Sequence, residues 1–180
     1  MCIIYNEVVC ERKICLNYEN PRLSQYKEFI NGKTASVIGV GISNVPLIEF
    51  LLKNGVEVTA RDMKSFDELC DINPKVRELE KQGVNFVLGE NYLSDIKEDI
   101  VYKSPGIRYD KEEIVKAVEN GSLITSEMEA FLSLCPSKII AVTGSDGKTT
   151  TTTLVAKILE AAGKKVWLGG NIGWPLLSEI

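Results

Sequence analysis

The chain has 180 residues, a net charge of −4 and a hydrophobic fraction of 44%, which suits one large or two small globular domains. The acidic balance does not indicate a nucleic-acid partner, and no apolar run approaches the roughly 20 residues that span a bilayer. Five cysteines without CxxC spacing indicate neither a disulfide framework nor a zinc site, and reduced thiols fit the cytoplasm. The N-terminus lacks a basic segment before its apolar stretch, so no signal peptide is expected.

Residues 1–22 show no clear period, and we interpret them as an N-terminal extension, with disorder as one alternative. From Thr34 onward, short apolar runs alternate with helical segments, which is typical of a parallel sheet covered on both faces. The helix ends are marked by Asn54-Gly55, Gly83 and Asn120-Gly121. In chain order, the expected strands are 34–38, 57–62, 85–88, 99–103 and 123–125, and the expected helices are 23–30, 45–52, 74–82, 111–119 and 126–134.

A boundary at Cys135-Pro136-Ser137 separates this block from a second one. After it, a strand (138–143), a glycine-rich turn, a helix (149–162) and another strand (165–168) repeat the cycle. Apolar residues at helical spacing are expected to pack this second helix on its sheet. They are Leu154, Val155, Ile158, Leu159 and Ala162.

The turn of the second block reads TGSDGKTT, from Thr143 to Thr150. Glycines let backbone N–H groups converge on an anion, the helix N-terminus adds its dipole, a lysine reaches the β- and γ-phosphates, and a hydroxyl can bind Mg²⁺. The candidate ATP-binding residues are Gly144, Ser145, Asp146, Gly147, Lys148, Thr149 and Thr150; Lys148 is the catalytic candidate, and Thr149 or Thr150 the Mg²⁺ ligand. Because Val142 stands where GxxxxGK[ST] has its first glycine, the alternative is a tight turn with an incidental lysine.

The predicted fold class is therefore α/β. A Rossmann-like parallel-sheet domain is expected over residues 23–135, followed by the incomplete start of a P-loop α/β ATPase domain over residues 138–180.

A second glycine-rich turn, Gly39-Val40-Gly41-Ile42-Ser43-Asn44, also joins a strand to a helix. It is similar to GxGxxG with Asn44 in place of the third glycine, and Asp62 ends the next strand, where a dinucleotide fold has the acid that binds a ribose. An NAD(P)-binding oxidoreductase domain is therefore one alternative.

Ser104-Pro105-Gly106 follows a later strand. Because ligands of doubly wound sheets bind at the carboxyl ends of strands, the turns at 39–44, 62–64 and 104–106 could line one crevice; an ordinary turn is the other interpretation of Ser-Pro-Gly.

With these turns, the phosphate loop and Gly170-Asn171-Ile172-Gly173, the chain resembles the Mur ligases from about residue 23 to its end. The GNIG segment points to the member that adds D-glutamate to UDP-N-acetylmuramoyl-L-alanine. The resemblance implies a cytoplasmic, ATP- and Mg²⁺-dependent ligase of peptidoglycan synthesis, monomeric at full length, that works through an acyl-phosphate. The family has its Mg²⁺-binding glutamate, a histidine, a carbamylated lysine and its D-glutamate domain after GNIG, so this chain alone is expected to be inactive.

The resemblance also implies the residues that bind the UDP substrate. They are Ile42, Ser43, Asp62, Met63, Lys64, Ser104, Pro105, Gly106 and Asn171. Those of the first turn match positions that contact the uridine or diphosphate, those at 62–64 lie beside the uracil, and those at 104–106 close over the nucleotide. Asn171 matches a residue near the muramoyl-alanine. A non-catalytic UDP-sugar or nucleotide-binding module is a further alternative.

Overall fold

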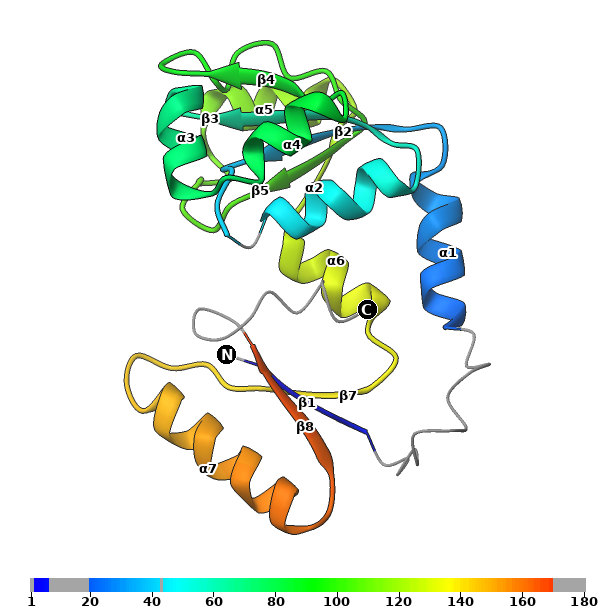
Figure 1. Ribbon diagram of the computed structural model, residues 1–180, viewed down its shortest axis with the longest axis vertical. Helices are drawn as coiled ribbons and strands as arrows, with labels where there is room; N and C mark the ends of the chain where they lie inside the picture. Colours follow the sequence, from blue (N-terminus) through cyan, green and yellow to red (C-terminus); the bar gives the residue numbers. More distant parts are fainter. Residues whose placement is uncertain (1, 7–19, 43, 170–180) are drawn as a thin grey trace.

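Two sheets organise the part of the chain that the structure describes (Figure 1). The computed structural model describes residues 2–6, 20–42 and 44–169. Five strands form one sheet in the order β4-β3-β2-β5-β6, and three form a second sheet in the order β7-β1-β8. Within the described ranges, no helix combines the length and the apolar character needed to cross a bilayer.

The five-stranded sheet is parallel throughout, as the alternation of strands and helices predicted. Its strands are β2 (Thr34–Ile38), β3 (Glu57–Asp62), β4 (Asn85–Leu88), β5 (Ile100–Lys103) and β6 (Leu123–Thr125). The chain moves outward from β2 through β3 to β4, then returns to the other side of β2 for β5 and β6. The strand order therefore reverses between β2 and β5, which is where ligands bind in doubly wound sheets.

Helices and one irregular segment cover both faces of this sheet. The helices are α1 (Pro21–Ile30), α2 (Asn44–Lys53), α3 (Phe66–Ile72), α4 (Val76–Lys81), α5 (Glu112–Glu119) and α6 (Glu127–Leu134). On β2, Ala35 and Val37 belong to the larger core, whereas Ile38 belongs to a smaller core with residues of α5 and of segment 92–96. Because both faces of the central strand are buried, its sequence, TASVI, lacks the alternation of apolar and charged residues that a half-exposed strand shows.

Helix α3 is an element that the sequence pattern did not predict. Ser65 caps it, with the Ser65 hydroxyl accepting from the Glu68 N–H while the Glu68 carboxylate accepts from the Ser65 N–H. This capping box was the available sequence signal. A seven-residue helix is too short to show a clear apolar period, which is why the pattern passed over it.

The second sheet contains β7 (Lys138–Ala141) and β8 (Lys165–Gly169), which are joined through α7 (Lys148–Ala161). Strand β1 (Cys2–Asn6) lies between them and is antiparallel to both, so β7 and β8 are parallel to each other. Figure 1 shows α7 along β8, on one side of this small sheet. The second block thus has a mixed sheet rather than the purely parallel one expected from its sequence.

Strand β1 changes the interpretation of residues 1–22 as an extension. Residues 2–6 pair with two strands that lie more than 130 positions away, a non-local contact that local sequence patterns do not reveal. Asn20 caps α1 and also donates from its amide to the Leu134 carbonyl, and the Arg22 guanidinium donates to the Cys135 carbonyl. The end of this segment is therefore bound to the end of α6. Residues 1 and 7–19 lie outside the described residues.

The contact face of α7 differs from the expected one. Thr152 and Ala156 are buried and Val155 and Leu159 are half-buried, whereas the expected core residues Leu154 and Ile158 are each 59% exposed. Ala162 is also exposed. The small side chains at 152 and 156, one turn apart, let the helix approach its sheet closely and so determine which face is buried.

Candidate functional site

Three turns follow the carboxyl ends of β2, β3 and β5, and hydrogen bonds join them into one structure. Gly39, directly after β2, donates its N–H to the Arg61 carbonyl at 2.7 Å. Its φ is +90°, and a Cβ built on it would lie 2.2 Å from the Ser104 hydroxyl oxygen. The first turn can therefore approach the Ser-Pro-Gly turn this closely only because position 39 is a glycine.

The first turn presents free backbone donors at the start of α2. The Gly41 carbonyl accepts from the N–H groups of Asn44 and Val45 at 3.1 and 3.2 Å, which begins the helix. Among the described residues, the N–H groups of Gly41 and Ile42 have no acceptor. Unpaired N–H groups beside a helix N-terminus are the usual arrangement for binding a phosphate. Ser43, a predicted site residue, lies outside the described residues.

Asp62 connects the first turn to the turn after β3. Its carboxylate is largely buried and accepts from the Val40 N–H at 2.8 Å and from the Lys64 N–H at 3.0 Å, one bond to each oxygen. The Lys64 ammonium lies 4.0 Å from the same group. Asp62 thus fixes the spacing of two predicted binding segments, and a ribose hydroxyl would have to use the lone pairs that remain.

Ser104 and Asn44 connect the first turn to the turn after β5. The Ser104 hydroxyl donates to the Ile38 carbonyl at 2.6 Å, and the Asn44 amide donates to the Gly39 carbonyl at 2.7 Å and the Ser104 hydroxyl at 3.3 Å. Pro105 and Gly106 are exposed at the tip of this turn. Sequence reasoning treated Asn44 only as a departure from the GxGxxG pattern and missed its bonding role.

Two apolar side chains of this region are free of the core. Ile42 is 69% exposed and Met63 is 66% exposed, and they belong to neighbouring turns of the same sheet edge. Most other large apolar side chains of this sheet lie in its two cores. Exposed apolar groups beside free N–H donors suit a ligand that has both a flat ring and phosphates.

The phosphate loop joins β7 to α7. Gly144 and Gly147 have φ values of +152° and +74°, and helix α7 begins at Lys148. The Lys148 ammonium donates back to the carbonyls of Gly144 and Ser145, so it lies over the loop that would hold an anion. A lysine in this position can turn toward a phosphate with little change in the backbone.

The threonines at the start of α7 differ in how far their side chains are buried. Thr149 and Thr150 are exposed in the first turn of α7, where a hydroxyl could reach a metal bound to phosphates. Thr152 is fully buried, and its hydroxyl donates to the Lys148 carbonyl at 2.6 Å. Asp146 is exposed. Among the described residues, no cluster of acidic or cysteine side chains could hold a metal ion alone. Asn171, another predicted site residue, lies outside the described residues.

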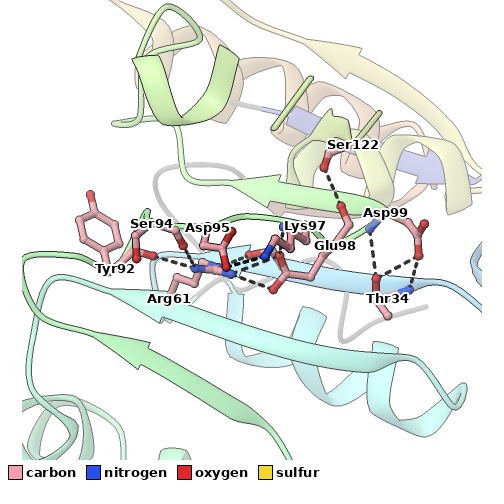
Figure 2. A network of polar contacts seen from close by, with 10 residues as sticks. Thr34, Arg61, Tyr92, Ser94, Asp95, Lys97, Glu98, Asp99 and Ser122 are labelled. Atoms are coloured by element: carbon pink, nitrogen blue, oxygen red, sulfur yellow. Dashed lines mark hydrogen bonds and ion pairs between the residues drawn. The ribbon is translucent and has the colours of Figure 1, made fainter. Parts of the chain in front are cut away.

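A separate polar network lies on the face of the sheet that segment 89–99 covers (Figure 2). The Arg61 guanidinium donates to the Ser36 hydroxyl, to the carbonyls of Tyr92 and Ser94, and to both oxygens of the Glu98 carboxylate. Burial raises the pKa of Glu98, but the bonds from Arg61 and neighbouring donors outweigh it, so the pKa is lower than usual. All five guanidinium N–H groups are used, which indicates a structural role for Arg61.

A shallow cavity of about 280 Å³ adjoins this network. It is lined by Thr34, Glu57, Thr59, Asp95, Lys97 and Glu98. Thr34 and Glu57 begin β2 and β3, so the cavity lies at the amino ends of these strands, opposite the three turns. It is therefore not part of the candidate site.

Two family models match the chain over most of its length. Residues 33–126, about half of the chain, match the Mur ligase MurD-like N-terminal domain, and residues 142–178 match the Mur ligase middle domain. The first range contains the five-stranded sheet and its three turns, and the second contains the phosphate loop and α7.

Curated relatives agree with these matches. The chain is 54% identical over 156 residues to a protein named UDP-N-acetylmuramoylalanine–D-glutamate ligase from Clostridium kluyveri, covering 86% of this chain and 33% of the relative. It is 52% identical over 158 residues to a protein of that name from Clostridium acetobutylicum, covering 87% of this chain and 34% of the relative. The chain thus spans about a third of the length of the curated relatives it matches.

Solved structures of related ligases are similar over part of the chain. A murein peptide ligase from Psychrobacter arcticus has 25% identity and a TM-score of 0.46, covering 73% of this chain and 27% of that one. The UDP-N-acetylmuramate-alanine ligase of Thermotoga maritima has 26% identity and the same TM-score, covering 73% of this chain and 30% of that one. On the evidence of the matching family models and of the sequence identity to its relatives, the chain belongs to the Mur ligase family.

Proposed function

We propose that this chain is the UDP-substrate-binding part, and the start of the ATP-binding part, of a ligase that adds D-glutamate to UDP-N-acetylmuramoyl-L-alanine in the cytoplasm. The observation that carries the proposal is the pair of glycine-rich strand-to-helix turns, one in each sheet, in a chain about half identical to relatives of that name. We further propose that residues 23–135 and 138–180 belong to two domains with these two roles, and that the full-length protein is a monomer.

The three turns of the five-stranded sheet suit a uridine diphosphate. The free N–H groups of Gly41 and Ile42, at the start of α2, would receive the diphosphate. The exposed side chains of Ile42 and Met63 would contact the uracil ring, and Lys64 adds a positive charge beside them. Pro105 and Gly106, on the turn after β5, would close over the nucleotide. Ser43 and Asn171 belong to the same proposed site.

The phosphate loop would bind ATP through the N–H groups of residues 144–150. The Lys148 ammonium would leave the loop carbonyls and pair with the β- and γ-phosphates. When bound, Mg²⁺ would neutralise charge on the transferred phosphoryl group, and the hydroxyl of Thr149 or Thr150 would help to hold it. Asp146 adds a negative charge to the loop, which the metal would offset.

The proposed reaction has two steps. A carboxylate oxygen of UDP-N-acetylmuramoyl-L-alanine takes the γ-phosphoryl group of ATP, and ADP leaves with the β–γ bridging oxygen. The D-glutamate amine then attacks the acyl carbon of the acyl-phosphate, phosphate leaves, and an amide bond forms with loss of a proton from the amine. Lys148 and the loop N–H groups stabilise the charge that develops on the phosphoryl oxygens.

The structure also bears on the two alternatives. An NAD(P) domain would use the carboxylate of Asp62 on a ribose, through the lone pairs that remain beside its two backbone N–H bonds, but such a domain would give no purpose to the phosphate loop. A non-catalytic UDP-sugar-binding module would need only the first sheet and would give no purpose to the phosphate loop. The ligase accounts for both glycine-rich turns.

The proposal is tested in a full-length ligase that contains this chain. Phosphate release from ATP should require both UDP-N-acetylmuramoyl-L-alanine and D-glutamate. Lys148→Ala should abolish this release, by a factor of about 10³ or more, while the affinity for the UDP substrate changes less than about twofold, because Lys148 and the three turns belong to different sheets. Loss of UDP-substrate binding in a folded Lys148→Ala protein would contradict the proposed division of roles.

A further inference from the structure

Asn44 occupies the place of the third glycine in the first turn, and its side chain is bonded rather than free. It begins α2 and is only 8% exposed. Its amide nitrogen lies 2.7 Å from the Gly39 carbonyl, 3.3 Å from the Ser104 hydroxyl and 3.4 Å from the Ile38 carbonyl. The two amide N–H groups are therefore shared among three acceptors, and none is left for a ligand.

The Ser104 hydroxyl also uses its only proton in a hydrogen bond within the protein. Its single proton goes to the Ile38 carbonyl at 2.6 Å, and the Ser104 N–H donates to the same carbonyl at 3.1 Å. A diphosphate is an acceptor and needs donors. Ser104 could donate to it only by giving up the bond to Ile38, so its hydroxyl is better placed to hold the turn than to bind the ligand.

The link joins two segments that are distant in sequence. Asn44 and Ser104 are separated by 60 positions and lie on either side of the point where the strand order reverses. The Ile107 N–H donates to the Ser104 carbonyl at 3.0 Å, so holding Ser104 also holds the tip of its turn. A glycine at position 44 would allow close packing but could make no such bond.

We infer that Asn44 is a positioning residue of the nucleotide site, acting through Ser104 to fix the turn at 104–106 against the free N–H groups of the first turn. The inference rests on the proposed function, in which these two turns bind one UDP group. In this inference Ser104 does not contact the ligand directly; its hydroxyl accepts from the Asn44 amide and so connects the turn at 104–106 to the first turn.

A double-mutant cycle on the 180-residue chain tests the inference, with the affinity for UDP-N-acetylmuramoyl-L-alanine measured by calorimetry. Asn44→Ala and Ser104→Ala should each weaken binding about tenfold, and the double variant should be no weaker than either one, because the two side chains act as one link. Ser104→Thr keeps the hydroxyl and should restore most of the affinity. Asn44→Asp has the same shape but no amide donors, and its negative charge would face carbonyl oxygens and the diphosphate, so it should weaken binding at least as much as Asn44→Ala.

Asn54 provides the matched control. It directly follows the last residue of the same helix, and its amide donates to the Phe50 carbonyl at 2.7 Å, away from the site. Asn54→Ala should lower the urea midpoint of unfolding but leave the affinity unchanged. Multiplicative losses in the Asn44→Ala/Ser104→Ala double variant, or wild-type affinity in folded Asn44→Ala, would overturn the inference.

Hydrogen exchange without ligand separates this inference from the proposed function. Asn44→Ala should speed exchange at the N–H groups of Ser104 and Ile107 about tenfold, and Asn54→Ala should not. Unchanged exchange in Asn44→Ala would show that the link does not hold the turn and would overturn the inference even if UDP binds. A wild-type chain that binds no UDP compound would overturn the proposed function and the positioning role together, whatever the exchange rates.

Discussion

Gly39 is the residue at which the site tolerates a side chain least. Its backbone has φ = +90°, and an added Cβ would lie 2.2 Å from the Ser104 hydroxyl oxygen. Such a distance is impossible without movement, and the neighbour that must move is bonded to both Ile38 and Asn44. The sequence indicated a glycine-rich turn here, but not which glycine is indispensable, because the atom that excludes a side chain comes from residue 104.

Gly39→Ala should therefore lower the free energy of unfolding by about 2–4 kcal/mol, through left-handed strain and the clash together. Gly55→Ala is the control, because Gly55 has a similar φ of +77° but nothing within 4 Å of an added Cβ. It should lose only about 1 kcal/mol. Urea unfolding followed by circular dichroism measures both values; equal losses in the two variants would contradict the close-approach argument.

At the scale of elements, segment 89–99 covers one face of the sheet where a helix would be usual. It contributes Tyr92, Leu93 and Ile96 to the smaller core, and Arg61 holds it through two carbonyls and the Glu98 carboxylate (Figure 2). The Ser122 hydroxyl adds a bond to the Glu98 carbonyl at 2.7 Å. The buried Arg61 guanidinium thus makes four of the side-chain hydrogen bonds that hold this segment to the sheet.

Removing the Arg61 guanidinium leaves the Glu98 carboxylate largely buried without its main partner. Arg61→Met should therefore destabilise the fold by roughly 3 kcal/mol at pH 7, and Arg61→Lys should recover only part of the loss because it lacks the planar fork. Urea unfolding measures both variants. Wild-type stability in Arg61→Met would contradict the structural role given to Arg61.

The same pair predicts a pH dependence. Because the pKa of Glu98 is lowered in the folded state, its contribution is present above the unfolded pKa of about 4.3 and is lost as the pH falls through the folded value. Glu98→Gln should thus be less stable than the wild type at pH 7, and the difference should shrink below about pH 4. A difference that stays constant from pH 7 to pH 3 would show that Glu98 does not act as a charged partner.

The elements that the sequence predicted well are those with strong local signals. Strands β2, β3, β4 and β6 match the expected ranges residue for residue, because each is a short segment with apolar or β-branched residues that is bounded by turn residues. Strand β1, the contact face of α7 and the bonding of Asn44 were not predicted. Each depends on a partner that is distant in sequence, or on small residues that allow close packing, and neither leaves a local pattern.

At the scale of the whole molecule, the two sheets differ in how well they are buried. The five-stranded sheet, together with the helices and the segment that cover it, contributes the residues of the two cores, whereas Ile139, Ile140, Val166 and Trp167 of the second sheet are only half-buried and Leu154 and Ile158 of α7 are exposed. Three short strands and one helix bury little apolar surface to offset the loss of chain entropy. The chain also spans about a third of the length of its relatives.

We therefore expect the purified 180-residue chain to release no phosphate from ATP when D-glutamate and UDP-N-acetylmuramoyl-L-alanine are added. Hydrogen exchange should show strong protection within residues 34–134 and little beyond 138, because the second sheet is marginal on its own. Turnover by the chain, free of any full-length enzyme, would contradict this expectation and would require a second copy or a partner to complete the site.

The central claim is that the turns after β2, β3 and β5 bind a UDP substrate, and calorimetric titration of the 180-residue chain tests it most directly. UDP-N-acetylmuramoyl-L-alanine and NADH are titrated separately under the same conditions. We predict saturable binding of the UDP substrate with one site per chain and no binding of NADH. Saturable binding of NADH without any response to the UDP substrate would contradict the claim.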